Sequence, residues 1–274
     1  MFTLNPNNLK NSCFVVFDDA LYDFYENAWP ILKKYKIPVT VFVPTDPVDK
    51  TEIYWSLQYL ELFIKSDYSN IDTIKHFHNN KIEILRLNKG DRVKQINNVH
   101  NLLMNKCSND RSITINLIKD SIVHESSASS LKMMSWDNII ELLNDNANIL
   151  NIQSHTKSHE YLPLLPKNDL EYEFNASKKD IIENLNISPL AISYPFGGYN
   201  DEVIKIAGKH YSYGFITDNK LLNLKQIHNK STNMKLSRIN VTDRSPWELY
   251  LRINGFHYFF TKLIRIFYPG WRFN

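Results

Sequence analysis

Cysteine is scarce in this sequence. Cys13 and Cys107 are the only two cysteines among 274 residues, which excludes a zinc site built from cysteine thiolates and makes a framework of disulfides unexpected. Unpaired thiols fit a reducing compartment best. We therefore expect a cytoplasmic protein.

Long apolar segments are also missing. The sequence contains no run of about 18 apolar residues, the length that a membrane-spanning helix needs. Residues 1–12 lack the apolar core followed by small residues that a signal peptide requires. We expect neither an export signal nor a transmembrane helix, in agreement with a cytoplasmic location.

A strong excess of one charge is absent too. The formal net charge is only +3 and the basic residues are spread along the chain, so no electrostatic footprint for nucleic acid is present. With 43% hydrophobic residues the chain can bury a full-sized core. No Gly/Ser linker, internal repeat or low-complexity tract marks a boundary, and the prediction is a single domain over residues 1–274.

Short apolar runs alternate with segments of helical period along most of the chain. This pattern predicts an α/β fold with a largely parallel sheet. The expected strands are residues 13–18, 39–44, 147–153, 190–195, 213–217 and 236–241, and the expected helices are residues 20–36, 136–145, 169–185 and 201–209.

Residues 50–130 follow a different pattern. They have a mostly helical period and are rich in Lys, Asn and Ser, and only the run KIEILRL at 81–87 resembles a strand. We interpret this segment as a helical insertion after the second strand.

The C-terminal segment predicts an amphipathic helix at about residues 245–268. Its apolar residues follow a four-three spacing, whereas Arg252, Lys262 and Arg265 fall elsewhere on the helical wheel. Such a helix either docks on the rest of the protein or makes peripheral contact with the inner face of a membrane. Docking is preferred, because Gly255 weakens a free-standing helix. The apolar residues are Leu249, Ile253, Phe256, Phe260, Leu263 and Phe267.

Two adjacent carboxylates, Asp18 and Asp19, directly follow the first expected strand. Two like charges this close raise the free energy unless a cation lies beside them. The plain alternative is a solvated turn in which one aspartate caps the following helix.

Two histidines, His155 and His159, stand four residues apart directly after the expected strand 147–153. On a helical turn this spacing lets both imidazoles reach one ion, although it also arises by chance in polar loops. Both the aspartate pair and the histidine pair follow a strand, and α/β folds assemble their sites at that edge. Two imidazoles and one carboxylate suit Zn²⁺, and the second carboxylate is then free to act as a base toward the attacking water.

Three motifs in this order resemble the polysaccharide deacetylases, the NodB homology domains of carbohydrate esterase family 4. The motif Thr-Phe-Asp-Asp-Gly of that family stands here as Val-Phe-Asp-Asp-Ala at 16–20, and His-Ser/Thr-x-x-His is intact at 155–159. The third motif, Arg-x-Pro-Tyr/Phe, is Ser-Tyr-Pro-Phe at 193–196. The likeness covers roughly residues 10–45 and 130–242, and three ordered motifs are far more specific than one.

The resemblance assigns roles to these residues. It implies Asp19, His155 and His159 as the ligands of one divalent metal ion, most simply Zn²⁺, and Asp18 as the catalytic base. It also implies that the backbone N–H of Phe196 stabilises the developing oxyanion.

The resemblance further implies a distorted, TIM-like (β/α)₇ barrel with the site at the C-terminal ends of the strands. Tyr194 and Pro195 of the third motif would then contact the substrate, or would form only a strand end and a tight turn. Trp136 would start a helix and join the core, or would form a wall of the sugar site.

Two departures from the family pattern concern the catalytic machinery. Ser193 replaces the arginine that begins the third motif and bonds the base, and Leu236-Ser237-Arg238 replaces a Leu-x-His that supplies a general acid. An arginine cannot give up its proton at physiological pH. Arg238 can instead restore the missing guanidinium and orient Asp18, which leaves the acid unassigned unless Asp18 itself returns its proton to the amine.

These inferences predict a hydrolase that removes an N-acetyl group from an amino sugar. Because no export is expected, a nucleotide-linked or lipid-linked sugar of surface polysaccharide assembly suits the chain better than a finished extracellular polymer. A deformylase of a formamido sugar is the nearest alternative. The two replacements also leave open a non-catalytic, sugar-binding member of the family.

Overall fold

The computed structural model describes most of the chain. The described residues are 12–65, 73–87, 91–122, 131–227, 229, 232–241 and 246–254. They form two compact units. The first contains the described residues of Met1–Asp19, Leu32–Thr45 and Asn146–Asn274, and the second contains those of Ala20–Ile31 and Asp46–Asp145. The single-domain organisation stays a prediction.

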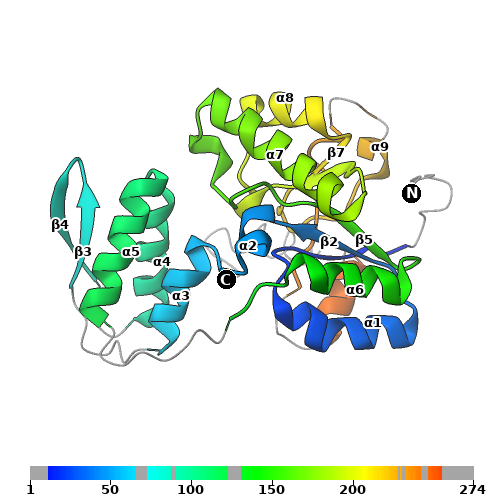
Figure 1. Ribbon diagram of the computed structural model, residues 1–274, viewed down its shortest axis with the longest axis horizontal. Coiled ribbons are helices and arrows are strands. Elements are labelled where there is room, and N and C mark those ends of the chain that lie inside the picture. The colour runs from blue at the N-terminus through cyan, green and yellow to red at the C-terminus, as the bar shows by residue number, and fades with distance from the viewer. Residues whose placement is uncertain are drawn as a thin grey trace, which may run out of the picture. The chain divides into compact units, whose positions relative to one another are not determined.

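The first unit is built on a five-stranded parallel sheet in the order β1-β2-β5-β6-β7 (Figure 1). Its β2 is buried along its whole length, as expected for a parallel strand that is covered on both faces. The strands are β1 (Val15–Phe17), β2 (Val39–Val43), β5 (Leu150–Ser154), β6 (Ala191–Ser193) and β7 (Tyr213–Phe215). All five arise from expected strands, although each is shorter at one or both ends.

The sixth expected strand, residues 236–241, is reduced to one parallel bridge between Phe215 and Leu236. Beyond that bridge, a side chain provides the hydrogen-bond partner of the main chain. The amide of Asn240 donates to the side chain of Asn219 at 3.0 Å. A backbone bonded in this way cannot extend the ladder of the sheet.

Two helices, α7 (Lys167–Leu185) and α8 (Asp201–His210), lie side by side in the first unit and pack on β5 and β7 respectively. Asn200 caps α8 by accepting the amide of Val203 at 2.9 Å. Asn186 ends α7 in the left-handed conformation at φ 54°. The shared core consists of Leu162, Leu170, Phe174, Ile192, Tyr194, Val203, Ile206, Ala207, Tyr211, Ile216 and Met234.

The other two expected helices are present with one difference. The segment 20–36 forms a π-helical turn over Phe24–Ala28 that continues as α1 (Trp29–Tyr35), and α6 covers Trp136–Asn146. A short α2 (Thr45–Lys50) follows β2.

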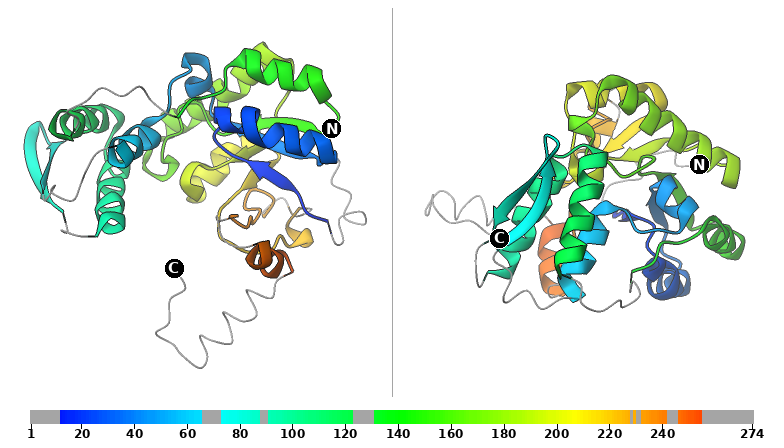
Figure 2. Two further views of the ribbon diagram at one scale, coloured as in Figure 1. Left: turned by 90° about the horizontal axis from the view of Figure 1, so that it is seen from below. Right: turned by 60° about the vertical axis from the view of Figure 1, so that its left-hand side comes forward.

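The second unit contains the predicted insertion, which has a core of its own. Three helices, α3 (Trp55–Lys65), α4 (Arg92–Met104) and α5 (Ser108–Ile122), pack with the hairpin of β3 (Thr73–His78) and β4 (Lys81–Arg86). Figures 1 and 2 show this hairpin beside α5. The core residues are Trp55, Tyr59, Phe63, Ile74, Leu87, Val99, Leu103, Ile115 and Ile118.

The predicted C-terminal helix is described only in part. A short α9 (Leu224–Ile227) precedes α10, which covers Pro246–Ile253, and residues 255–274 lie outside the described residues. Docking and membrane contact by this segment both stay predictions. Among the described residues, no helix has the length and apolar character needed to cross a membrane.

Candidate active site

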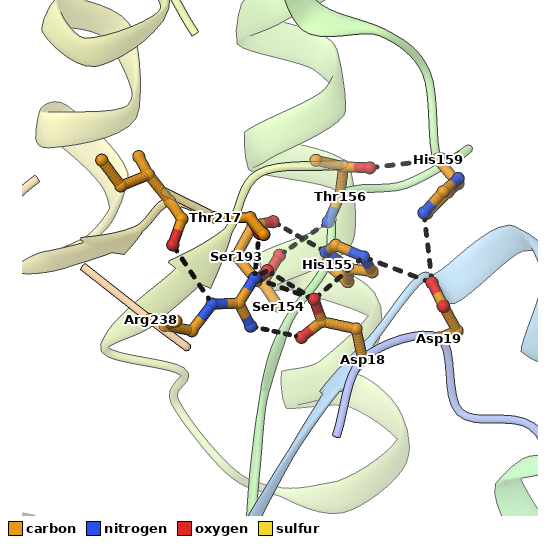
Figure 3. A network of polar contacts seen from close by, with 10 residues as sticks. Asp18, Asp19, Ser154, His155, Thr156, His159, Ser193, Thr217 and Arg238 are labelled. Atoms are coloured by element: carbon orange, nitrogen blue, oxygen red, sulfur yellow. Dashed lines mark hydrogen bonds and ion pairs between the residues drawn. The ribbon is translucent and has the colours of Figure 1, made fainter. Parts of the chain in front are cut away.

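The candidate metal ligands follow the ends of two strands of the same sheet, β1 and β5, which β2 separates. Asp19 follows β1, His155 follows β5, and His159 lies four residues further along the same loop. Asp19 Oδ1 is 3.3 Å from His155 Nε2 and 3.2 Å from His159 Nε2 (Figure 3). One ligand atom from each residue lies within 4.8 Å of the others, so one carboxylate oxygen and two imidazole nitrogens converge on one point.

The ring of His155 is oriented by the main chain. Its Nδ1 lies 2.7 Å from the carbonyl oxygen of Ser193, at the end of β6. A carbonyl oxygen only accepts hydrogen bonds, so Nδ1 carries a proton and, in the neutral ring, Nε2 presents its lone pair toward Asp19. An imidazole held through its other nitrogen in this way is typical of metal-binding histidines.

Asp19 Oδ1 provides a test of whether these residues fit a metal ion. This oxygen is buried and, within the part of the chain that the structure describes, has no hydrogen-bond partner. A buried carboxylate oxygen without a donor is destabilising, and a lone pair of His155 facing it adds to the cost. A cation at the shared point removes both costs. The donor set, two nitrogens and one oxygen, suits Zn²⁺.

The backbone around the site is strained. Asp19, Thr156, His159 and Phe196 all have positive φ angles, at 77°, 70°, 58° and 57°. For residues other than glycine, the left-handed region costs roughly 1–2 kcal/mol each. Such residues persist only where the surrounding structure holds them, and they concentrate at functional sites.

Asp18 is held by a planar fork of hydrogen bonds. Arg238 Nη1 donates to Asp18 Oδ1 at 2.7 Å, and Nη2 donates to Oδ2 at 2.9 Å (Figure 3). The same Nη2 reaches Ser193 Oγ at 2.9 Å and Thr217 Oγ1 at 3.2 Å. Ser193 Oγ in turn donates to Asp18 Oδ2 at 3.1 Å. The guanidinium that is missing at position 193 is thus supplied by Arg238, in the contact that the sequence predicted.

The guanidinium of Arg238 is itself fixed in place. It lies over the ring of Phe42, 5.7 Å from the ring centroid, and only 10% of the arginine side chain is exposed. Phe42 packs against Phe215 with ring centroids 5.5 Å apart. A cation over an aromatic face, away from water, keeps one orientation, so the fork that holds Asp18 is preorganised.

The charges around the aspartates set their ionisation. Burial raises the pKa of Asp18, but the electrostatic effect of His155 and the charge and hydrogen bonds of Arg238 outweigh burial and hold the pKa below its usual value. Burial also raises the pKa of Asp19, and the close contacts of its carboxylate with the imidazoles of His155 and His159 lower the pKa further than burial raises it. Both carboxylates are therefore ionised at neutral pH, as a base and a ligand must be.

The third motif is divided between the site and the core. The ring of Phe196 meets that of His159 edge to face, with centroids 4.8 Å apart, and the side chain is partly exposed. Tyr194, by contrast, is buried and donates its hydroxyl to the carbonyl of Met234 at 3.1 Å. Successive residues leaving a strand point to opposite faces, so Ser193 faces Asp18 while Tyr194 faces the core. Pro195 is buried as well, and the structure does not support side-chain contacts from Tyr194 or Pro195 to a substrate.

Trp136 lies in the second unit. It begins α6, is mostly buried, and donates its indole N–H to Asp49 Oδ1 at 2.9 Å. This agrees with a role in starting the helix and joining the core. A contribution to the sugar site stays a prediction.

Comparisons with known sequences agree with the motifs. The sequence model described as polysaccharide deacetylase matches residues 117–214, which include both histidines and the third motif. A poly-beta-1,6-N-acetyl-D-glucosamine N-deacetylase of Staphylococcus aureus is 25% identical over 251 residues, covering 90% of this chain and 60% of the relative. An enzyme of the same name from Staphylococcus epidermidis is 42% identical over 45 residues, 16% of each chain. The chain thus spans about 60% of the length of the curated relatives that it matches over most of its own length.

Comparisons with solved structures agree with the fold. A Streptococcus pyogenes deacetylase in complex with acetate has a TM-score of 0.52 at 19% identity, covering 90% of this chain and 75% of that one. A polysaccharide deacetylase from Bacillus cereus has a TM-score of 0.51 at 18% identity, covering 88% and 50%. The predicted fold class is confirmed, with five strands and one bridge in the described part of the sheet. The chain is similar in sequence to polysaccharide deacetylases, as its three motifs predicted.

Proposed function

We propose that this chain is a metal-dependent hydrolase that removes the N-acetyl group from an N-acetylated amino sugar. One observation carries the proposal. Three ligand-type side chains converge on a point beside an ionised aspartate, and that aspartate is held by a preorganised arginine. The names of the matched relatives support the same chemistry.

In this proposal, Asp19, His155 and His159 hold one divalent metal ion, most simply Zn²⁺. When bound, the ion would act as a Lewis acid on the amide carbonyl and would lower the pKa of water at the site. The two histidines bind through Nε2, which for His155 follows from the hydrogen bond that its Nδ1 makes. Asp19 offers the buried oxygen for which the described residues provide no donor.

Asp18 is the general base. About a quarter of its side chain is exposed, so a water molecule can approach it, and Arg238 keeps it charged and in one orientation. As the oxygen of water bonds to the carbonyl carbon, its proton passes to Asp18. When the C–N bond breaks, the protonated Asp18 gives that proton to the departing amine. One residue then serves as base and acid in turn, which removes the need for the histidine that Arg238 replaces.

Phe196 contributes through its main chain. Its N–H would donate to the oxygen that gains negative charge during attack. The left-handed φ of 57° sets the direction of its peptide groups, and the contact of its ring with His159 ties this turn to the ligand set.

For the substrate we favour a chain of β-1,6-linked N-acetylglucosamine, because the matched relatives are named for it. The prediction of a nucleotide-linked or lipid-linked sugar depends on the expected cytoplasmic location, which nothing in the fold tests. Both candidates present the same acetamido group to the site, and they differ only in what surrounds it.

Acetate release by the full chain tests the proposal. We expect acetate from oligomers of β-1,6-linked N-acetylglucosamine, loss of activity after chelation, and recovery on adding Zn²⁺. If acetate is released only from a nucleotide-linked or lipid-linked N-acetyl sugar, the proposed reaction stands and the proposed substrate is wrong. Tight binding of oligomers without acetate release, by protein that contains metal, would contradict the proposal and favour the non-catalytic alternative.

A further inference from the structure

A stripe of polar side chains runs along the otherwise apolar face of α7. Glu173, Ser177 and Asp180 follow the four-three spacing that places them on one side of the helix. Glu173 and Ser177 are buried, next to the core residues Leu170 and Phe174. Buried polar groups in this setting need partners, and all three find them in the loop after β5 or in that loop's neighbours.

Glu173 makes the most contacts with the loop that carries the candidate ligands. One carboxylate oxygen, Oε2, accepts the amide of Lys157 at 2.9 Å and the amide of Ser158 at 3.0 Å. The other oxygen, Oε1, accepts the hydroxyl of Ser158. Successive amides that point at one anion form a nest, so this loop is shaped to receive a carboxylate.

The rest of the stripe supports the same loop. Ser177 Oγ lies 2.8 Å from Ser154 Oγ, at the end of β5. Asp180 accepts a hydrogen bond from the ammonium of Lys157 at 2.8 Å and another from the hydroxyl of Thr45, the first residue of α2. The stripe therefore binds the loop at its start and in its middle.

The contacts of Glu173 lie between the two strained residues of the loop. Thr156 and His159 both have left-handed φ angles, and the two amides that Glu173 accepts belong to the residues between them. The side chain of Thr156 continues the chain of contacts, because its Oγ1 accepts the amide of His159 at 3.2 Å (Figure 3). Removing Glu173 would free a segment that the local geometry alone does not favour.

The two histidines depend on this loop to different degrees. His155 directly follows β5, pairs its amide with Val43, and has its ring held by Ser193. His159 is itself the second strained residue of the loop, and its Nε2 lies 3.2 Å from Asp19 Oδ1. A change in the loop would therefore displace His159 more than His155.

We propose that Glu173 is a positioning residue of the metal centre, which holds the loop between His155 and His159 in the conformation that aims His159 at Asp19. The proposal rests on the proposed metal site but not on the identity of the substrate. Glu173 acts through the loop and touches neither the metal nor the substrate. A role of this kind resembles that of the outer hydrogen-bond partners of metal ligands, whose loss lowers metal affinity by about 10–100-fold.

Glu173→Ala and Glu173→Gln separate this role from simple packing. Both amides bond the same carboxylate oxygen, and the hydroxyl bonds the other. A glutamine with its oxygen at the first position therefore keeps both amide bonds. Its NH₂ group can donate to Ser158 Oγ after the hydroxyl rotates. Glutamine should rescue the site, and alanine should not.

Glu171→Ala is the matched control. Glu171 lies two residues earlier on α7 and pairs with Lys209 and His210 of α8, so its removal changes the same charge on the same helix without touching the loop. Zn²⁺ affinity is measured on the full chain by competition with a chelator. The visible spectrum of the Co²⁺-loaded chain reports the ligand geometry, and unfolding of the metal-free chain measures stability separately.

We expect Glu173→Ala to bind Zn²⁺ at least about 10-fold more weakly and to shift the Co²⁺ spectrum, while Glu173→Gln and Glu171→Ala stay within about 3-fold of wild type. If the alanine variant does not fold, Glu173→Asp, which keeps the charge but falls short of the loop, should show the same weakening. Two results would overturn this inference and leave the proposed metal site unaffected. One is an unchanged Zn²⁺ affinity and Co²⁺ spectrum in Glu173→Ala or Glu173→Asp, and the other is a Glu173→Gln variant that binds Zn²⁺ as weakly as Glu173→Ala. A wild-type chain that binds no Zn²⁺ would overturn the proposed metal site with it.

Discussion

Arg238 of the first unit and Arg111 of the insertion are two largely buried arginines with different partners. Each guanidinium lies over an aromatic ring, that of Phe42 for Arg238 and that of Trp55 for Arg111. Arg238 gives its hydrogen bonds to a carboxylate beside the candidate ligands. Arg111 gives its bonds to main-chain carbonyls.

Those carbonyls lie in the last turn of α4 and just after it. Arg111 Nε donates to the carbonyl of Leu103, within the last turn, at 3.0 Å, and Nη2 donates to the carbonyl of Lys106, two residues after the helix, at 2.7 Å. The last carbonyls of a helix lack partners within it, and a cation satisfies both their hydrogen bonds and the negative end of the helix dipole. An arginine therefore supports main-chain carbonyls in one unit and holds the proposed catalytic base in the other, and this difference follows from its hydrogen-bond partners.

Substitution of the proposed base, Asp18, should have the largest effect on turnover. Asp18→Asn keeps the size of the side chain and can still accept from Arg238, but an amide cannot take a proton from water. General bases contribute about 10²–10⁴-fold, so we expect kcat to fall by roughly that factor with the metal content unchanged. Acetate release and elemental analysis on the same sample check this, and near-normal turnover would mean that the base lies elsewhere.

Arg238→Ala should have the next largest effect on turnover. Without the fork Asp18 loses its orientation, and we expect kcat to fall about 10–100-fold with bound metal retained. Arg238→Lys should recover only part of the loss, because an ammonium offers a point charge and no planar fork. Steady-state kinetics of the two variants decide this, and an alanine variant with wild-type kcat would show that Arg238 has no part in orienting the base.

Arg111→Ala should affect stability and leave the chemistry unchanged. The change removes bonds to buried carbonyls and leaves space beside Trp55, which costs about 2–3 kcal/mol of unfolding free energy. Denaturant unfolding measures the loss, while kcat of the folded fraction should equal that of wild type. A lower kcat in Arg111→Ala with unchanged stability would show that Arg111, like Arg238, affects turnover.

The smallest expected effect concerns the hairpin of the insertion. Asn79 and Asn80 join β3 to β4, and both have positive φ angles, 48° and 59°, as the two-residue type I′ turn requires. Asn80→Gly gives the preferred Asn-Gly pair and relieves the left-handed strain at position 80, so it should raise the unfolding free energy by up to about 1 kcal/mol. Metal affinity and kcat should not change, and a lower melting temperature would argue against this turn type.

The sequence predicted the catalytic sheet better than the insertion. Buried parallel strands such as VTVFV at β2 are continuous apolar runs, and they remain visible without knowledge of their neighbours. The strand β3 was missed because TIKHFH contains only two apolar residues, Ile74 and Phe77, and pairs on one edge with a stronger strand. Its existence depends on packing against α5, which local sequence does not show.

The site residues that could be predicted from the sequence are those that belong to recognisable motifs. The order of the motifs identified Asp18, Asp19, His155 and His159. The contact of Arg238 with Asp18 could also be predicted, because Arg238 can supply the guanidinium that is missing where Ser193 stands. Glu173 was missed, because a glutamate on a helix is most often exposed. The one signal was its position on the apolar face of α7, between Leu170 and Ile181. The burial of Tyr194 could not be predicted, because a motif does not show which face of the strand end a side chain takes.

Metal content tests the central claim most directly. Elemental analysis of the full chain purified with Zn²⁺ should give about one metal ion per chain, since one site of three ligands is proposed. His159→Ala should lose most of that metal, while His78→Ala, which removes an exposed histidine of the hairpin, should retain it. A His159→Ala variant that keeps a full equivalent of zinc would contradict the assignment of Asp19, His155 and His159 as the metal centre.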